Sequence, residues 1–419
     1  MRFQNLLAHR TRHMSRSAIR EILKVASQPG MLSLAGGIPA PASFPLELIG
    51  DLTRKVIDKY ADQAFQYGLT EGFMPLRQAL AAHLTERDIH VPGETILISS
   101  GSQGVLDAIG KILISPGDTV GLESPTYLGA LQAFAPYEPH YSAIDCDKDG
   151  VIPEALEQVL ADGRVKFIYL VPTFQNPSGR TLPLGRRRAI ATLIERYDAL
   201  LIEDDPYCDL RYEGKALPPI KSLAPEHVVY VGTLSKVFAP GLRIGYCAAP
   251  EPIRNWLVLV KQGVDLHTST FNQALAAEYL EGGHLQQHLP HILKLYRPRQ
   301  KAMLEALERY LPSDFQWSRP EGGMFVWVEG PEGVNMADIY QAAVRRQVAF
   351  VPGHFFFAKP DDGLGTMRLN FTMPSTDEID RAVQTLGKVI REFSRRPVSQ
   401  ESGGPEWQQN ASRAGLEVL

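Results

Sequence analysis

The sequence has little cysteine, no long apolar run and no strong excess of either charge. Only three of its 419 residues are cysteines, and no two form a Cys-x-x-Cys pair, so neither a disulfide framework nor a cysteine zinc site is favoured. A net charge of -4 and a pI near 6.3 argue against a nucleic-acid surface. No apolar run approaches the length that crosses a bilayer. We therefore expect a cytoplasmic protein without nucleic-acid or membrane partners.

The rest of the composition is that of an ordinary globular protein. Hydrophobic residues make up 44% of the chain and charged residues 21%, so a large core can form. Short apolar runs alternate with helix-length segments, a pattern typical of a mainly parallel sheet covered on both faces. The runs are 95–99, 119–122, 165–171, 199–202, 228–231 and 243–248. We expect a large α/β lobe.

The pattern changes after residue 282. From 282 to 312 the apolar spacing predicts a long helix, kinked or broken near Pro298. Beyond it, three runs indicate strands and a final amphipathic stretch indicates a helix, which together predict a smaller α+β lobe. These segments are 323–329, 348–352, 366–372 and 377–393. We expect an N-terminal arm with part of the small domain (1–44), a large domain (45–285), a small domain (286–396) and a disordered tail (397–419).

Lys236 is the residue from which the chemistry can be read. It follows the apolar run 227–231, and burial beside Arg243 would lower the pKa of its amine and make it a nucleophile suited to Schiff-base formation. The hydroxyls of Thr233 and Ser235, with the Arg243 guanidinium, provide hydrogen-bond donors for an anion. The simpler interpretation is a surface lysine beside a Pro-Gly turn.

Polar residues also follow other apolar runs. Asn176 lies in a Pro- and Gly-containing loop after one run, and Asp204 follows another, where burying an acid is costly unless a cation such as a protonated pyridine meets it. Ser102 and Gln103 follow a glycine at the start of a predicted helix, a favourable place for phosphate. Alternatively, Asn176 is only a turn residue and Asp204 forms a solvated pair with Asp205.

Together these segments require a ligand with a phosphate, an aldehyde and a ring base, which describes pyridoxal 5'-phosphate. The order Gly-Ser-Gln, Asn-Pro-Ser-Gly, Glu-Asp-Asp-Pro-Tyr and Ser-Lys-x-x-x-Pro-Gly-x-Arg resembles the fold-type I, class I/II aminotransferases over most of the chain. The motifs at 34–39, 66–68 and 320–327 resemble the 2-aminoadipate/kynurenine aminotransferase branch. The resemblance implies an α/β, fold-type I PLP-dependent transferase, in which a mainly parallel seven-stranded sheet forms the large domain beside a smaller α+β domain.

The resemblance also implies roles for single residues. Lys236 would form the Schiff base with the cofactor and carry the substrate proton, and Asp204 would keep the pyridine nitrogen protonated. Asn176 and Tyr207 would form hydrogen bonds with the phenolic oxygen of the cofactor ring. Tyr127 would stack on the face of that ring. The phosphate would be held by Ser102, Gln103, Ser235, Arg243 and, from the second subunit of a homodimer, Tyr67. Without the family match, both Tyr127 and Tyr67 could equally be core or interface aromatics.

Other positions would contact the substrate, and no metal is expected. By resemblance, Arg368 would clamp the α-carboxylate bidentately, with Asn176 and the backbone of Gly37 nearby. Arg20 resembles an N-terminal helix arginine that some members of this branch use to meet a distal carboxylate. The alternatives are a surface ion pair for Arg368 and, for Arg20, a solvated pair with Glu21.

We therefore predict that the protein transfers the amino group of an L-amino acid, 2-aminoadipate as the best guess, to 2-oxoglutarate by a ping-pong mechanism. Aromatic amino acids, kynurenine and branched-chain amino acids are alternative donors, and Leu234, where this branch commonly has an aromatic, leaves the preference open. A β-lyase or 1-aminocyclopropane-carboxylate synthase would share the core residues. A non-enzymatic MocR-like regulator domain is the remaining alternative, although about forty residues before the match are too few for its DNA-binding module.

Overall fold

The largest sheet is built from apolar runs that alternate with helices. The computed structural model describes residues 3–14 and 18–394, except the side chains at 4, 18–20 and 394. The sheet has the order β2-β10-β9-β8-β7-β3-β4, and β10 is its one strand antiparallel to its neighbours. The strands are β2 Ile96–Ser99, β3 Thr119–Glu123, β4 His140–Ile144, β7 Val165–Leu170, β8 Leu201–Asp204, β9 Val228–Thr233 and β10 Gly245–Ala248. The predicted mainly parallel seven-stranded sheet is confirmed.

Both faces of this sheet are buried, which explains its continuous apolar strands. Successive strand residues alternate between two hydrophobic clusters: Tyr169 and Ile202 belong to one, whereas Ile168 and Leu201 belong to the other. One cluster is closed by α4 Ser102–Leu113, α5 Leu128–Phe134 and α9 Glu251–Val264, and the other by α6 Pro153–Ala161, α7 Leu184–Arg196 and α8 Ile220–Leu223. Ligand-binding residues are therefore confined to the ends of the strands.

The sequence did not reveal β4. This strand lies at the edge of the sheet beside β3, and only Ile144 among its five residues is buried. An edge strand that is half exposed carries polar residues and lacks the continuous apolar run by which the other strands were recognised.

A second, four-stranded sheet has the order β11-β12-β15-β14 and is antiparallel throughout. Beside it, β1 pairs with β13 in parallel, so the chain before the large sheet joins the lobe built mostly from residues after it. The elements are β1 Leu32–Ser33, β11 Gln316–Trp317, β12 Phe325–Glu329, α12 Met336–Val344, β13 Val348–Ala349, β14 Val351–Pro352, β15 Thr366–Asn370 and α13 Thr376–Ser394. The domain boundaries at 44/45 and 285/286 stay a prediction.

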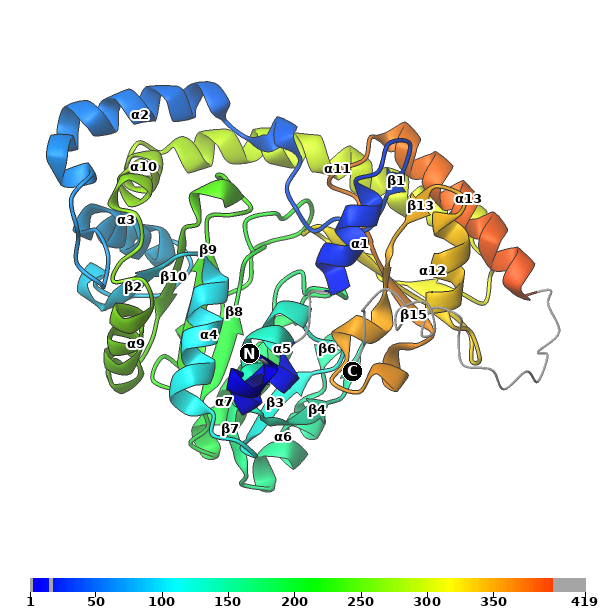
Figure 1. Cartoon of the computed structure of the whole chain (residues 1–419), viewed down its shortest axis with the longest axis horizontal. Helices are drawn as coiled ribbons and strands as arrows, with labels where there is room; N and C mark the ends of the chain where they lie inside the picture. Colours follow the sequence, from blue (N-terminus) through cyan, green and yellow to red (C-terminus); the bar gives the residue numbers. More distant parts are fainter. Residues whose placement is uncertain (1–2, 15–17, 395–419) are drawn as a thin grey trace.

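A single long helix, α11 His284–Tyr310, connects the two lobes (Figure 1). It contains Pro290 and Pro298 but continues through both, so it is not broken near Pro298 as the sequence suggested it could be. Its buried face, which includes Tyr296 and Met303, belongs to a core cluster shared with α13. This packing compensates for the backbone hydrogen bonds that the prolines remove.

The N-terminal segment touches both lobes. It forms η1 Phe3–Leu6 and η2 His9–His13, which packs against η6 Ala135–Tyr137 of the large lobe, and then α1 Ala18–Ala26, which packs against β13. At the end of the molecule opposite the smaller lobe, α10 Thr270–Glu281 packs against α2 Leu46–Tyr60 and α3 Met74–Thr85 (Figure 1). The remaining elements are η3 Pro41–Ser43, η4 Ala61–Ala64, η5 Gly93–Thr95, β5 Cys146–Asp147, β6 Gly150–Val151, η7 Pro240–Leu242, η8 Gly353–Phe356 and η9 Pro360–Gly363.

The cysteines and the apolar content of the helices can be compared with what the composition predicted. All three cysteines are free thiols. Among the described helices, none combines the length and the apolarity that crossing a bilayer requires. The tail expected to be disordered, 397–419, lies outside the described residues.

Candidate active site

The polar residues singled out in separate motifs follow different strands of the seven-stranded sheet and meet at one edge of it. Asp204 ends β8, Asn176 follows β7 and Lys236 follows β9. The Asn176 amide donates to the Tyr207 hydroxyl (3.4 Å), and the Lys236 Nζ lies 5.8 Å from the centre of the Tyr207 ring. Because parallel strands end at the same edge, residues far apart in the sequence converge here.

Asp204 is a buried carboxylate that no cation among the described residues neutralises. Its side chain is in the last residue of β8, and the residue is 2% exposed. Oδ2 accepts a hydrogen bond from the Tyr169 hydroxyl (2.8 Å), whereas Oδ1 is buried without a partner among the described residues. Burial and, to a smaller extent, the charge of Asp205 raise the pKa of Asp204 to about 7. The unpaired oxygen fits a protonated ring nitrogen.

Lys236 is an amine whose surroundings favour the neutral form. Desolvation by burial, then the positive charges of Arg368 and Arg243, lower its pKa to about 8. Its Nζ donates a hydrogen bond to the backbone carbonyl of Gly37 (3.1 Å), so the N-terminal segment reaches the same place. A neutral, positioned amine is what nucleophilic attack on an aldehyde requires.

Arg368, on β15, brings the smaller lobe into the site. It is 1% exposed, and its hydrogen bonds to the described residues involve no carboxylate. Nη1 donates to Oδ1 of Asn176 (2.8 Å), Nη2 donates to the carbonyls of Ala35 and Gly36 (3.2 Å each), and Nε has no partner there. Burial lowers its pKa to about 10. A buried guanidinium without a counter-ion is costly, so this geometry fits an anionic ligand.

The guanidinium of Arg368 also lies over two aromatic rings. It lies 4.3 Å from the ring centre of Phe325 and 5.0 Å from that of Phe356. Such cation–π contacts hold a planar guanidinium in one orientation while leaving its edge able to bind a carboxylate. The sequence did not single out either phenylalanine for this purpose.

The turn between β2 and α4 has the geometry of an anion site. Gly101 adopts a positive φ of 88°, a backbone conformation that favours glycine, and the Arg243 guanidinium lies against it. Thr233 pairs with Gly245, which lies against Gly101, so the end of β9 adjoins this turn. Arg243 Nη2 donates to the Ser100 carbonyl (3.1 Å), and the helix N-terminus begins at Ser102. A phosphate is favoured there by the helix dipole and backbone N–H groups.

Other predicted residues are placed less simply. The Gln103 side chain donates to the Gly129 carbonyl (2.7 Å), which engages one of the two N–H groups of its amide. Tyr127 precedes α5 with its ring against Gly129, where a Cβ would lie 2.3 Å from the ring carbon Cζ. Burial and then the charge of Asp204 raise the Tyr127 pKa to about 12. Ser235 accepts a hydrogen bond from the Thr233 hydroxyl (2.9 Å).

Among the described side chains of one chain, Tyr67 is not joined to this cluster, and the side chain of Arg20 is not described. Tyr67 is 79% exposed and its ring meets His267 edge-on, with the ring centres 5.7 Å apart. An exposed ring is compatible with the expected role of Tyr67 as a phosphate contact in the active site of a second subunit. That role stays a prediction. Arg20 lies in α1, but its side chain is outside the described part of the structure.

The sequence also matches a known family pattern. The family described as "Aminotransferase class I and II" matches residues 46–386. The chain belongs to this aminotransferase family. Two solved structures similar to this chain contain the cofactor in modified form, one as PMP and the other as a phosphopyridoxyl derivative of leucine. Pyridoxal phosphate is the cofactor of this chain.

Three relatives place this aminotransferase more closely. It is 45% identical to aromatic-amino-acid aminotransferase 1 of Thermococcus litoralis over 94% of this chain and 96% of the relative. The kynurenine aminotransferase of Pyrococcus horikoshii, solved with PMP, is 43% identical with a TM-score of 0.91 over 94% of this chain and 99% of that one. The alpha-aminoadipate aminotransferase of Thermus thermophilus, complexed with N-(5'-phosphopyridoxyl)-L-leucine, is 36% identical with a TM-score of 0.87 over 94% and 99%. The predicted family and branch are confirmed.

Tyr169 and Gly129 contribute to the geometry and were missed by sequence reasoning. Tyr169 lies within the apolar run of β7, and its bond to Asp204 depends on β7 and β8 being neighbours in the sheet. The one available signal was a hydroxyl in an otherwise apolar buried strand, which must find a partner.

Proposed function

We propose that this aminotransferase moves the amino group of an L-amino acid, with 2-aminoadipate as the leading candidate, to 2-oxoglutarate in two half-reactions of a ping-pong cycle. The observation that carries this proposal is the convergence of an uncompensated buried acid, Asp204, an uncompensated buried cation, Arg368, and an amine of lowered pKa, Lys236. Asp204 would then meet the protonated ring nitrogen of the cofactor, Arg368 the substrate carboxylate and Lys236 the cofactor aldehyde.

Pyridoxal phosphate supplies an aldehyde and a protonated ring that takes up the electrons released at the substrate Cα. Asp204 would accept the ring N–H through Oδ1, while the Tyr169 hydroxyl fixes the other oxygen and so orients the carboxylate. Lys236 would remove the Cα proton, because its neutral form is populated near neutral pH and its amine is held in place by the Gly37 carbonyl.

The remaining cofactor contacts follow from the same geometry. Tyr127 would cover one face of the cofactor ring. Asn176 and Tyr207, which are hydrogen-bonded to one another, would form hydrogen bonds with the phenolic oxygen of the ring. The phosphate would lie at the N-terminus of α4, held by Ser102, Gln103, Ser235 and Arg243, with Tyr67 of a second copy.

The substrate carboxylate would bind Arg368. Its guanidinium is oriented by two rings and by Asn176, and its Nε lacks a partner among the described residues, so a bidentate carboxylate would complete its hydrogen bonds. Gly37 would lie beside this carboxylate, because a Cβ built there would be in ordinary contact, at 3.5 Å, with an Arg368 Nη atom.

We also propose that the active form is a homodimer. Large apolar side chains remain exposed on α2 and in the chain after it, at Leu46, Ile57, Phe65, Tyr67 and Leu69. Exposed apolar side chains concentrated in one segment of the chain are typical of an interaction surface, and a second copy would bury them and bring Tyr67 to the neighbouring site.

Two donor classes need to be separated. An aromatic or kynurenine donor is the second candidate, because relatives named for these substrates match over nearly the whole chain. Purified holoenzyme would be given 2-oxoglutarate with 2-aminoadipate, kynurenine, phenylalanine, leucine or alanine, and kcat/KM compared. We expect 2-aminoadipate to give the highest value. A higher value for an aromatic donor would replace the leading candidate, and no glutamate formation from any donor would reject the proposed transfer.

A further inference from the structure

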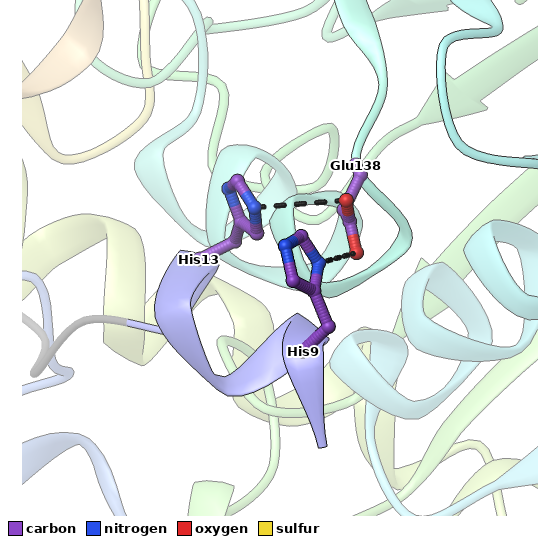
Figure 2. Close-up of side chains that lie close together, drawn as sticks. All are labelled: His9, His13 and Glu138. Atoms are coloured by element: carbon purple, nitrogen blue, oxygen red, sulfur yellow. Dashed lines mark hydrogen bonds and ion pairs between the residues drawn. The ribbon is translucent and has the colours of Figure 1, made fainter. Parts of the chain in front are cut away.

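A group of metal-ligating side chains lies away from the candidate active site. His9 and His13 begin and end η2, and Glu138 follows η6, 125 residues later in the chain than His13. Figure 2 shows both imidazoles turned toward the one carboxylate, from a helix of the N-terminal segment and from a loop of the large lobe. The proposed transamination uses none of these three residues.

The distances in this group match those of ligands that share one metal ion. The His9 Nδ1 lies 3.2 Å from Glu138 Oε1, and the His13 Nε2 lies 3.6 Å from Oε2. One possible ligand atom from each residue lies within 4.8 Å of the other two. Two atoms bound to the same tetrahedral zinc at about 2.1 Å are about 3.4 Å apart. Small rotations of the side chains would therefore complete the geometry.

The exposure of the three side chains permits this adjustment and leaves room for a water ligand. The His9 side chain is 64% exposed and that of His13 45%, whereas that of Glu138 is 23% exposed. Glu138 also adopts a positive φ of 58°, which costs a non-glycine residue about 1 kcal/mol, and its carboxylate faces η2 (Figure 2). As plain ion pairs, exposed contacts of this kind would contribute only about 0–1 kcal/mol each.

We propose that His9, His13 and Glu138 bind one divalent transition-metal ion, with Zn²⁺ the best fit to two imidazoles, one carboxylate and a water. Imidazole and carboxylate are established zinc ligands, and a site with three protein ligands keeps an open position. Bound metal would fasten the N-terminal segment to the large lobe. The same segment then forms α1, whose Ile22 packs in one cluster with Leu128 of the large lobe and Trp327 of the smaller one, so the chain that the metal would fasten also contributes to the interface between the lobes.

The first test is a calorimetric titration of holoenzyme with Zn²⁺ in a phosphate-free buffer near neutral pH. The variants are His13→Ala and Glu138→Gln, with His227→Ala as the matched control, because His227 forms an exposed pair with Asp198 at the same 3.2 Å distance but has no second histidine. We expect one ion per chain, at least tenfold weaker binding in the two cluster variants, and unchanged binding in the control. Transaminase activity would show that each variant is folded.

The second test uses trypsin, which cleaves after the exposed Arg10 and Arg12 within η2. Zn²⁺ should slow cleavage at these two bonds in unchanged protein and in His227→Ala, but not in Glu138→Gln. The proposal would be overturned by the absence of stoichiometric binding, by unchanged binding in both cluster variants, or by an equal loss of binding in the control. Stoichiometric binding without protection at Arg10 and Arg12 would reject the fastening role and retain the site.

Discussion

Asp204 and Asp205 are neighbours in the chain with opposite surroundings. Asp205 meets Arg87 (2.7 Å between Nη2 and Oδ2) and the Tyr230 hydroxyl, in a buried ion pair inside the fold. Asp204 meets Tyr169 but no cation among the described residues. Consecutive residues at the end of a strand point to opposite faces, so one acid is neutralised by the protein and the other is left for a ligand.

Two buried arginines, neither of them ion-paired among the described residues, differ in their hydrogen bonds. Arg187 is 1% exposed, and its guanidinium donates to the carbonyls of Leu182, Pro172 and Pro218 and to the Thr173 hydroxyl. Arg368 is equally buried but retains an Nε without a partner among the described residues. Burial by itself therefore does not distinguish a structural charge from a functional one. The two acids differ in charge compensation, although Oδ1 of each lacks a partner among the described residues, and the two arginines differ in the completeness of their hydrogen bonds.

The largest effect should come from the lysine. Lys236→Ala should lower transamination by at least about 10³-fold, since the proposed proton transfer loses its base. Lys221 is the control, because burial likewise lowers its pKa to about 8. Its amine donates instead to the Pro225 and Val228 carbonyls, and neither of these residues belongs to the candidate active site. Lys221→Ala should reduce stability and keep turnover. Equal turnover in unchanged protein and Lys236→Ala, measured with 2-oxoglutarate, would contradict the assignment.

The paired acids should separate catalysis from stability. Asp204→Asn should lower kcat by about 10²-fold, because a charge aimed at the reacting ring is lost. Asp205→Asn should leave Arg87 buried without its counter-ion and cost about 3–5 kcal/mol of the free energy of unfolding. Steady-state kinetics and urea denaturation on both variants measure the two effects. Similar kinetic losses in both variants would remove the distinction.

The paired arginines should behave in the same way with smaller effects. Arg368→Lys should raise KM for amino donors by about tenfold or more, because an ammonium cannot bind a carboxylate bidentately. Arg187→Lys should change KM little and lower stability by about 1–3 kcal/mol through unpaired carbonyls. KM with two amino donors and thermal melting curves, measured on both variants, separate the expected loss of substrate binding from the expected loss of stability. A raised KM in Arg187→Lys but not in Arg368→Lys would reverse the proposed roles.

The smallest effect concerns the substrate side chain. If Arg20 meets a distal carboxylate, Arg20→Ala should raise KM for 2-aminoadipate by about tenfold, the value of one charge-assisted hydrogen bond of about 1.5 kcal/mol. KM for leucine, which has no distal carboxylate, should stay nearly constant. Parallel increases for both donors would show that Arg20 has no such role.

Much of the fold and of the site could be predicted because both depend on local patterns. Continuous apolar runs revealed six strands of the large sheet, and the polar residues that follow them, including Asp204 and Lys236, lie at its edge. The edge strand β4 and the unbroken course of α11 could not be predicted. One lacks an apolar run, and the other depends on tertiary packing that outweighs the effect of its prolines.

The sequence by itself determined the α/β class, the order of the motifs and the chemical types available for the cofactor, because strand periodicity and residue chemistry are local properties. Only the tertiary structure decided which charges remain uncompensated. Asp204 and Asp205, or Arg187 and Arg368, are the same residue types in the sequence, and their partners come from strands and loops distant in the chain. The meeting of His9 and His13 with Glu138 has the same origin, since spatial proximity of remote segments is a property of the packed fold.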